Sequence, residues 1–154
     1  MNSDERWDSF RYDYIETGWF DYDRHKTIAA MRKLSERIPD DVLENLPPLT
    51  VFAPSAALLG HVLPHGTGDS IFVYLSPRLE RASQAEVDFT VAHEFAHIVL
   101  GHYKPGATDH PPDVVVQRHE DVPSEQDADR LAESWGFKSK VKRKTLRGRA
   151  VKSQ

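Results

Sequence analysis

The strongest pattern of apolar positions runs from Ser83 to Leu100, where no glycine or proline interrupts the chain. Apolar side chains recur there at helical spacing and form one stripe, which consists of Val87, Val91, Phe95 and Ile98. Further apolar residues cover most of the other faces, so the pattern predicts a central, buried helix. Ser83 and Glu86 have the spacing of a capping box at its start, and Gly101 is a natural stop at its end.

Weaker periodicity predicts the other helices. The range Asp23 to Ile38 carries apolar side chains near helical spacing and is followed by Pro39, which indicates an amphipathic helix. Residues 40–46 can add a short helical turn. A further helix is expected from Ser124 to Trp135, because serine is a favoured cap and a glycine follows the range directly.

Two short runs rich in β-branched and aromatic residues, Leu49 to Phe52 and Ser70 to Leu75, predict strands. Residues 56–63 fit no single pattern, and residues 101–123 form a long connection with four prolines, of the kind that is usually functional or mobile. Helices and a few strands in this order indicate an α+β domain with a small sheet.

The chain of 154 residues is one domain's worth and long enough to bury a core without disulfides. Because it has no cysteine, a disulfide framework, thiolate metal ligands and a cysteine nucleophile are all excluded. The longest apolar run is far shorter than a membrane span, and the acidic, aromatic start of the chain does not have the form of an export signal. We therefore expect no membrane partner.

Charge and aromatic content divide the chain into three regions. Residues 1–22 form an acidic arm with seven aromatic side chains, which we expect to pack on the body or on a partner chain. Residues 23–137 are expected to form the domain, and residues 138–154 a basic tail. The net charge of −4 combines −12 over residues 1–133, which hold all 24 acids, with +8 over residues 134–154. Such a tail can bind nucleic acid, but the absence of aromatics between its cations favours a solvated, flexible tail.

The predicted central helix carries His93, Glu94 and His97. The two histidines lie about 40° apart on adjacent turns, so both imidazoles can bind one metal ion. This is the His-Glu-x-x-His pattern, in which two histidines hold zinc and the glutamate takes a proton from the water that the metal activates. The alternative is two hydrogen-bonded core histidines, but chance would place the pattern only roughly 0.03 times in a chain of this composition. We therefore interpret these residues as part of a zinc site.

A catalytic zinc typically has three protein ligands. Glu125 and Asp129 lie one turn apart on the predicted helix 124–135, so Glu125 can bind the metal while Asp129 orients a ligating histidine. The alternative for Glu125 is a solvated acid that the start of the helix favours. His119 is the fallback ligand. His102 is one residue too close to His93 for the longer pattern His-Glu-x-x-His-x-x-Gly-x-x-His.

Two segments together resemble the ImmA/IrrE family of small bacterial and phage metallopeptidases. They are His-Glu-Phe-Ala-His-Ile-Val-Leu-Gly-His, which starts at His93, and Glu-Gln-Asp-Ala-Asp-Arg-Leu-Ala, which starts at Glu125. Members of that family often have His-Glu-Leu-Gly-His and Glu-x-Glu-Ala-Asn/Asp-x-Phe-Ala. The departures here are mild and consist of Phe95 and Ala96 for Leu-Gly, Asp127 for Glu, and Leu131 for Phe. The likeness covers about residues 23–137, and neither the arm nor the tail takes part in it.

The resemblance implies a zincin-like fold, one zinc ion in a thermolysin-like glutamate-zinc arrangement, and a cytoplasmic setting. It also implies cleavage of a protein or peptide substrate, often a transcriptional repressor that binds DNA. The ligands implied are His93, His97 and Glu125, with Glu94 as the general base. His102 and Tyr103 become candidate contacts to the substrate or transition state, although His102 also fits a plain cation at a helix end. A strand next to the metal helix can pair with an extended substrate, and Ser70 to Leu75 is either that strand or an ordinary core strand.

Two rival functions remain compatible with the sequence. One is a zinc-stabilised interaction domain without catalysis, against which the intact Glu94 argues. The other is a peptidase that acts on DNA-bound proteins through the basic tail and resembles SprT-like enzymes, in which the third ligand would be a histidine.

Overall fold

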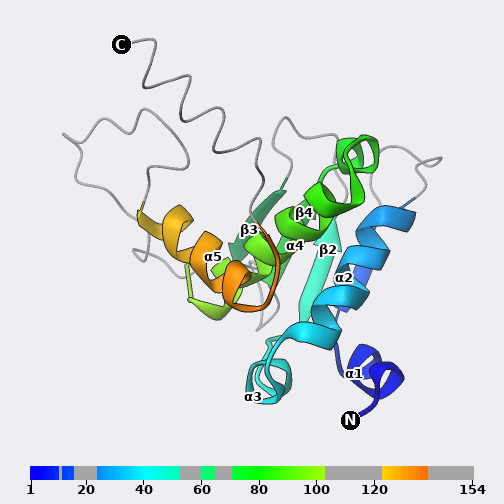
Figure 1. Ribbon diagram of the computed structural model, residues 1–154, viewed down its shortest axis with the longest axis vertical. Coiled ribbons are helices and arrows are strands. Elements are labelled where there is room, and N and C mark those ends of the chain that lie inside the picture. The colour runs from blue at the N-terminus through cyan, green and yellow to red at the C-terminus, as the bar shows by residue number, and fades with distance from the viewer. Residues whose placement is uncertain (11, 16–23, 53–59, 65–70, 103–122, 139–154) are drawn as a thin grey trace.

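Most of the described chain is helical. The computed structural model describes residues 1–10, 12–15, 24–52, 60–64, 71–102 and 123–138, which form the coloured ribbon of Figure 1. Its helices are α1 (Ser3–Ser9), α2 (His25–Arg37), α3 (Asp40–Glu44), the 3₁₀ helix η1 (Pro77–Arg81), α4 (Gln84–Val99) and α5 (Pro123–Ser134). The predicted positions of α2, α4 and α5 are therefore confirmed to within two residues at each end. Within the described ranges, no helix has both the length and the apolar character that crossing a membrane requires.

Four strands form one small sheet. They are β1 (Tyr12–Ile15), β2 (Leu49–Phe52), β3 (Gly60–Pro64) and β4 (Ile71–Leu75), in the order β1-β2-β4-β3. β1, β2 and β4 run parallel, whereas β3 is antiparallel to β4. Since β4 is hydrogen-bonded on both sides, the predicted strand Ser70 to Leu75 cannot pair with a substrate and is a core strand. The edges of the sheet are β1 and β3.

Helix α4 lies at the centre of the domain, as its sequence predicts. It contacts α2 on one side and α5 on another, and it also packs against β3 and β4 (Figure 1). Eight consecutive residues, 91–98, are buried, because every face of this helix meets another element. The Ser83 side chain accepts a hydrogen bond from the Glu86 backbone N–H, which caps the first turn. The residues of interest therefore lie on the helix that carries the longest buried run in the described part of the chain.

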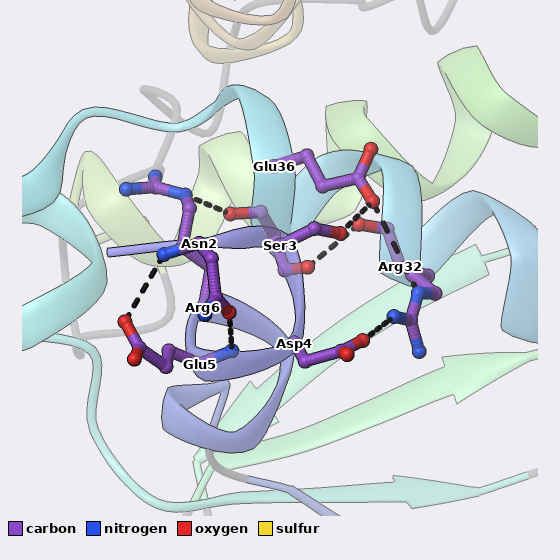
Figure 2. A network of polar contacts seen from close by, with 8 residues as sticks. Asn2, Ser3, Asp4, Glu5, Arg6, Arg32 and Glu36 are labelled. Carbon is purple, nitrogen blue, oxygen red and sulfur yellow. Dashed lines mark hydrogen bonds and ion pairs between the residues drawn. The ribbon is translucent and has the colours of Figure 1, made fainter.

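Residues 3–15, within the aromatic arm of the sequence analysis, contribute α1 and the edge strand β1. Figure 2 shows how α1 is joined to α2 by polar contacts between Ser3 and Glu36 and between Asp4 and Arg32. At the end of α1, the ring of Phe10 stacks on that of Phe95 of α4 with 5.0 Å between centroids. This contact ties the first helix to the central one.

Several sequence predictions fall outside the described residues. They concern the candidate contact Tyr103, the fallback ligand His119, the long connection up to residue 122, and the basic tail beyond Lys138.

Candidate metal centre

Three side chains of the described residues bring potential metal ligands to one point. They are His93 and His97 of α4 and Glu125 of α5, and their ligand atoms all lie within 4.8 Å of one another. His93 Nε2 is 2.6 Å from Glu125 Oε2, His97 Nε2 is 3.1 Å from Glu125 Oε1, and the two Nε2 atoms are 3.1 Å apart. All three residues are buried. Two imidazoles and a carboxylate gathered in this way form a candidate metal site.

The helices explain this convergence. His93 and His97 are four residues apart, so α4 places both rings on one face. Glu125 is in the first turn of α5, and the same face of α5 carries Ala128 and Ala132, both fully buried. These small side chains allow α5 to approach α4 closely, which brings the Glu125 carboxylate within reach of both histidines.

Each histidine is also held from behind. His93 Nδ1 is 2.8 Å from Asp129 Oδ1, and His97 Nδ1 is 2.8 Å from His102 Nδ1. With Nδ1 engaged, each ring turns its Nε2 toward the cluster. Metal-binding histidines typically have a partner of this kind, which fixes the orientation and tautomer of the ring. The site thus has supporting residues as well as candidate ligands.

The electrostatic environment favours positive charge at the centre. Burial works to lower the pKa of His93, but hydrogen bonds to Asp129 and Glu125 and the nearby charge of Glu94 outweigh it and raise that pKa to about 9. For His102, burial and the neighbouring His97 lower the pKa from its usual value. The centre therefore attracts a cation, while His102 at its margin is disposed to stay neutral.

Glu94 lies beside the three candidate ligands without being one of them. It is buried at 7% exposure, and its charge acts on His93. Glu94 is thus close enough to the candidate site to influence the charge of one of its histidines. This agrees with the place of the glutamate in the His-Glu-x-x-His pattern.

The geometry of the donors fits zinc. Two ligand atoms about 2.1 Å from a tetrahedral zinc ion are roughly 3.4 Å apart. The three separations in this site, 2.6, 3.1 and 3.1 Å, are each within about 1 Å of that value, so small side-chain rotations suffice. Nitrogen and carboxylate donors in a three-ligand set suit zinc, although other divalent ions accept the same donors.

The structure brings together five of the residues that the sequence singles out, namely His93, His97, Glu125, Asp129 and His102. The ring of His102, a candidate contact to the substrate or transition state, lies at the end of α4 against Nδ1 of His97. The signal for this position is Gly101, whose positive φ of 75° turns the chain back over α4. In the sequence, that glycine predicts only the end of a helix.

Comparison with known proteins gives no match to any protein-family model, any curated protein or any solved structure.

Proposed function

We propose that this protein is a zinc-dependent peptidase in which His93, His97 and Glu125 hold the metal. The observation that carries the proposal is the convergence of these three side chains beside a buried Glu94 that is not one of the three. Two histidines from one helix and a glutamate from the next correspond to the arrangement of glutamate-zinc peptidases with a zincin-like fold. The resemblance to the ImmA/IrrE family points to the same activity and to a protein substrate, with a DNA-binding repressor as the first candidate.

A zinc ion held by His93, His97 and Glu125 would supply a Lewis acid, which would polarise the scissile carbonyl and lower the pKa of a water molecule. The role proposed for the Glu94 carboxylate is to accept a proton from the attacking water as the water oxygen bonds to the carbonyl carbon. Glu94 then delivers the proton to the amine nitrogen as the carbon–nitrogen bond breaks. Asp129 holds His93 in place through Nδ1 and so keeps the ligand set rigid during these steps.

The sheet suggests how a peptide can be held. β3 is an edge strand that contacts α4, and within the described part of the chain no strand pairs with its outer side. An extended peptide can add to such an edge through its backbone, which holds it without reading its sequence. We therefore assign substrate pairing to β3, in place of the strand Ser70 to Leu75 that the sequence offered.

The decisive experiment is the substitution Glu94→Gln. Glutamine keeps the size of the side chain but cannot accept the proton, so this variant should bind zinc and substrate without turnover. Proteins retained by Glu94→Gln from a native lysate should be cut into discrete fragments when zinc-loaded wild-type protein is added, and a chelator should suppress the cleavage. Glu133→Gln, at an exposed position of α5, is the matched control and should cleave like wild type.

The rival function gives a different result. If wild-type and Glu94→Gln proteins retain the same partners in equal amounts and uncut, the domain is a zinc-stabilised interaction module. Metal content tests the assignment of the ligands separately from the catalytic role. Glu125→Ala should lose bound zinc, whereas His119→Ala and Glu133→Ala should keep about one ion per chain. Loss of zinc in His119→Ala alone would contradict the assignment of Glu125.

A further inference from the structure

The chain that follows α4 folds back over the helix and contacts the candidate ligand His97. His102 N–H donates to the His97 carbonyl at 2.9 Å, and Gly101 N–H donates to the Ile98 carbonyl at 3.0 Å. With Gly101 at a φ of 75°, these two bonds form a Schellman motif, a common way to close a helix with glycine. In this motif the second residue beyond the helix lies over the residue five positions earlier. Here those two residues are His102 and His97.

The side chains of His97 and His102 are also in contact. A Schellman motif usually places an apolar contact between these two positions. In this protein an imidazole pair takes its place, with 2.8 Å between His97 Nδ1 and His102 Nδ1. His102 therefore holds His97 twice, through its backbone N–H and through its ring.

When His97 binds a metal, only one arrangement of the ring protons allows a hydrogen bond between His97 and His102. Neutral imidazole carries one proton, so a histidine that offers the Nε2 lone pair has its proton on Nδ1. The His97 Nδ1–H must then donate to His102 Nδ1, which has to be unprotonated, and the proton of His102 lies on its own Nε2. A doubly protonated His102 would bring two N–H groups face to face.

We propose that His102 is a positioning residue of the metal centre, which accepts a hydrogen bond from His97 Nδ1 and thereby fixes the tautomer and direction of that ligand. The inference rests on the proposed metal site and adds a role that differs from contact with substrate. His93 is oriented by Asp129 from another helix, whereas His97 is oriented from the end of its own helix. The end of α4 therefore contributes to the orientation of His97, in addition to the contact of its Nε2 with Glu125 of α5.

The test compares two substitutions of His102 by their zinc affinity, measured by competition with a chromophoric chelator. His102→Ala removes the acceptor and should weaken zinc binding about 10- to 100-fold, the usual loss for an outer partner of a metal ligand. His102→Asn offers an amide oxygen near the position of the former Nδ1 and should restore affinity to within about threefold of wild type. Leu100→Ala, at an exposed position two residues before His102, is the matched control and should leave the affinity unchanged.

A spectroscopic readout separates positioning from mere support of the fold. In the zinc-loaded wild-type protein, imidazole ¹⁵N shifts should show a protonated Nδ1 on His97 and an unprotonated Nδ1 on His102. The circular dichroism and unfolding midpoint of the metal-free protein should be the same for the alanine and asparagine variants, although their zinc affinities differ.

Two outcomes overturn the inference while leaving the proposed function in place. One is wild-type zinc affinity in His102→Ala, and the other is an equal loss in the alanine and asparagine variants. A wild-type protein that binds neither zinc nor another divalent ion would instead overturn the metal site itself, and this inference with it.

Discussion

His93 lies between two carboxylates, and the arrangement that suits a metal ion also suits a proton. Its Nδ1 faces Asp129 and its Nε2 faces Glu125, each within hydrogen-bond distance. In the metal-free protein, a protonated ring satisfies both carboxylates, and its pKa rises to about 9. Proton and metal therefore compete for the same buried site.

This competition predicts how the stability of the metal-free protein depends on pH. Below pH 6.5 the His93 ring is protonated in both the folded and the unfolded chain, so the stabilisation from the raised pKa is fully present. Between pH 6.5 and about 9 only the folded state retains the proton, so the free energy of unfolding should fall as pH rises, by about 3 kcal/mol in all. Urea unfolding at pH 6, 7.5 and 9 measures this, with His93→Gln as the control that should remove the trend. A flat or rising profile in the wild-type protein would contradict it.

Zinc affinity should change with pH in the opposite direction. Because His93 must lose its proton to bind metal, the apparent affinity should increase by up to about tenfold per pH unit until the pH approaches 9. The free energy of unfolding of the metal-free protein thus falls over the same pH range in which the apparent affinity for zinc rises.

Local periodicity was enough to find most of the site, because its parts lie on two helices. The spacing of His93, Glu94 and His97 is meaningful as soon as α4 is expected, and the pair Glu125 and Asp129 follows from α5 in the same way. The position of His102 could not be read from helical spacing, because it depends on a left-handed glycine beyond the helix end. The pKa of His93 depends on side chains that lie 32 and 36 residues away and needed the tertiary structure.

At the scale of elements, Arg6 is the main polar connection between α1 and the rest of the helical layer. Its Nε donates to the Ser35 carbonyl at 2.8 Å, and its other nitrogens contact the Ile38 carbonyl and the Asp40 carboxylate. The two carbonyls belong to the end of α2, where helical partners run out, so a charged donor from another helix satisfies them. One guanidinium therefore joins α1, the end of α2 and the start of α3.

We expect Arg6→Ala to lower the free energy of unfolding by about 2 kcal/mol, because two charge-assisted bonds to backbone carbonyls are lost. Denaturant unfolding of the zinc-loaded protein measures the change. Arg130→Ala is the matched control, since that arginine is 72% exposed and its ion pair with Asp127 should contribute at most about 0.5 kcal/mol. Zinc affinity should stay the same in both variants. Equal stability of the two variants would show that the contacts of Arg6 contribute no more than a surface ion pair.

Helices were easier to predict than the sheet for a physical reason. The signal for α2, α4 and α5 is contained in each segment, as an apolar stripe with a cap or a stop. A strand is defined by its partners, and Tyr12–Ile15 pairs with Leu49–Phe52 across 33 intervening residues. Tyr12, Asp13 and Tyr14 alternate, but over too few residues to define a strand within an aromatic-rich run. Gly60–Pro64 begins with glycine and ends with proline, which are both unfavourable in strands, so neither strand was predicted.

At the scale of the whole molecule, the candidate metal centre lies at the interface between α5 and the rest of the described domain. α5 packs against α4, and its buried acids Glu125 and Asp129 both face histidines of that helix. α2 is attached to α4 by other means, including the ion pair of Lys33 with Asp88. A metal ion in this site would therefore stabilise the packing of α5 in particular.

Removal of metal should accordingly destabilise the protein as a whole and α5 most of all. Zinc at about 100 times its dissociation constant adds roughly 2.7 kcal/mol to the free energy of unfolding, which for a chain of this size raises the melting temperature by roughly 5 to 10 °C over the chelator-treated protein. Hydrogen exchange followed by mass spectrometry should show the largest gain on chelation in peptides that cover Pro123–Ser134, with a smaller gain in His25–Arg37. Glu125→Ala should show neither the shift in melting temperature nor the change in exchange, since it lacks the ligand that α5 contributes. If zinc slows hydrogen exchange equally in α2 and α5 of the wild-type protein, its effect is a general one and the ion does not act at the interface between α4 and α5.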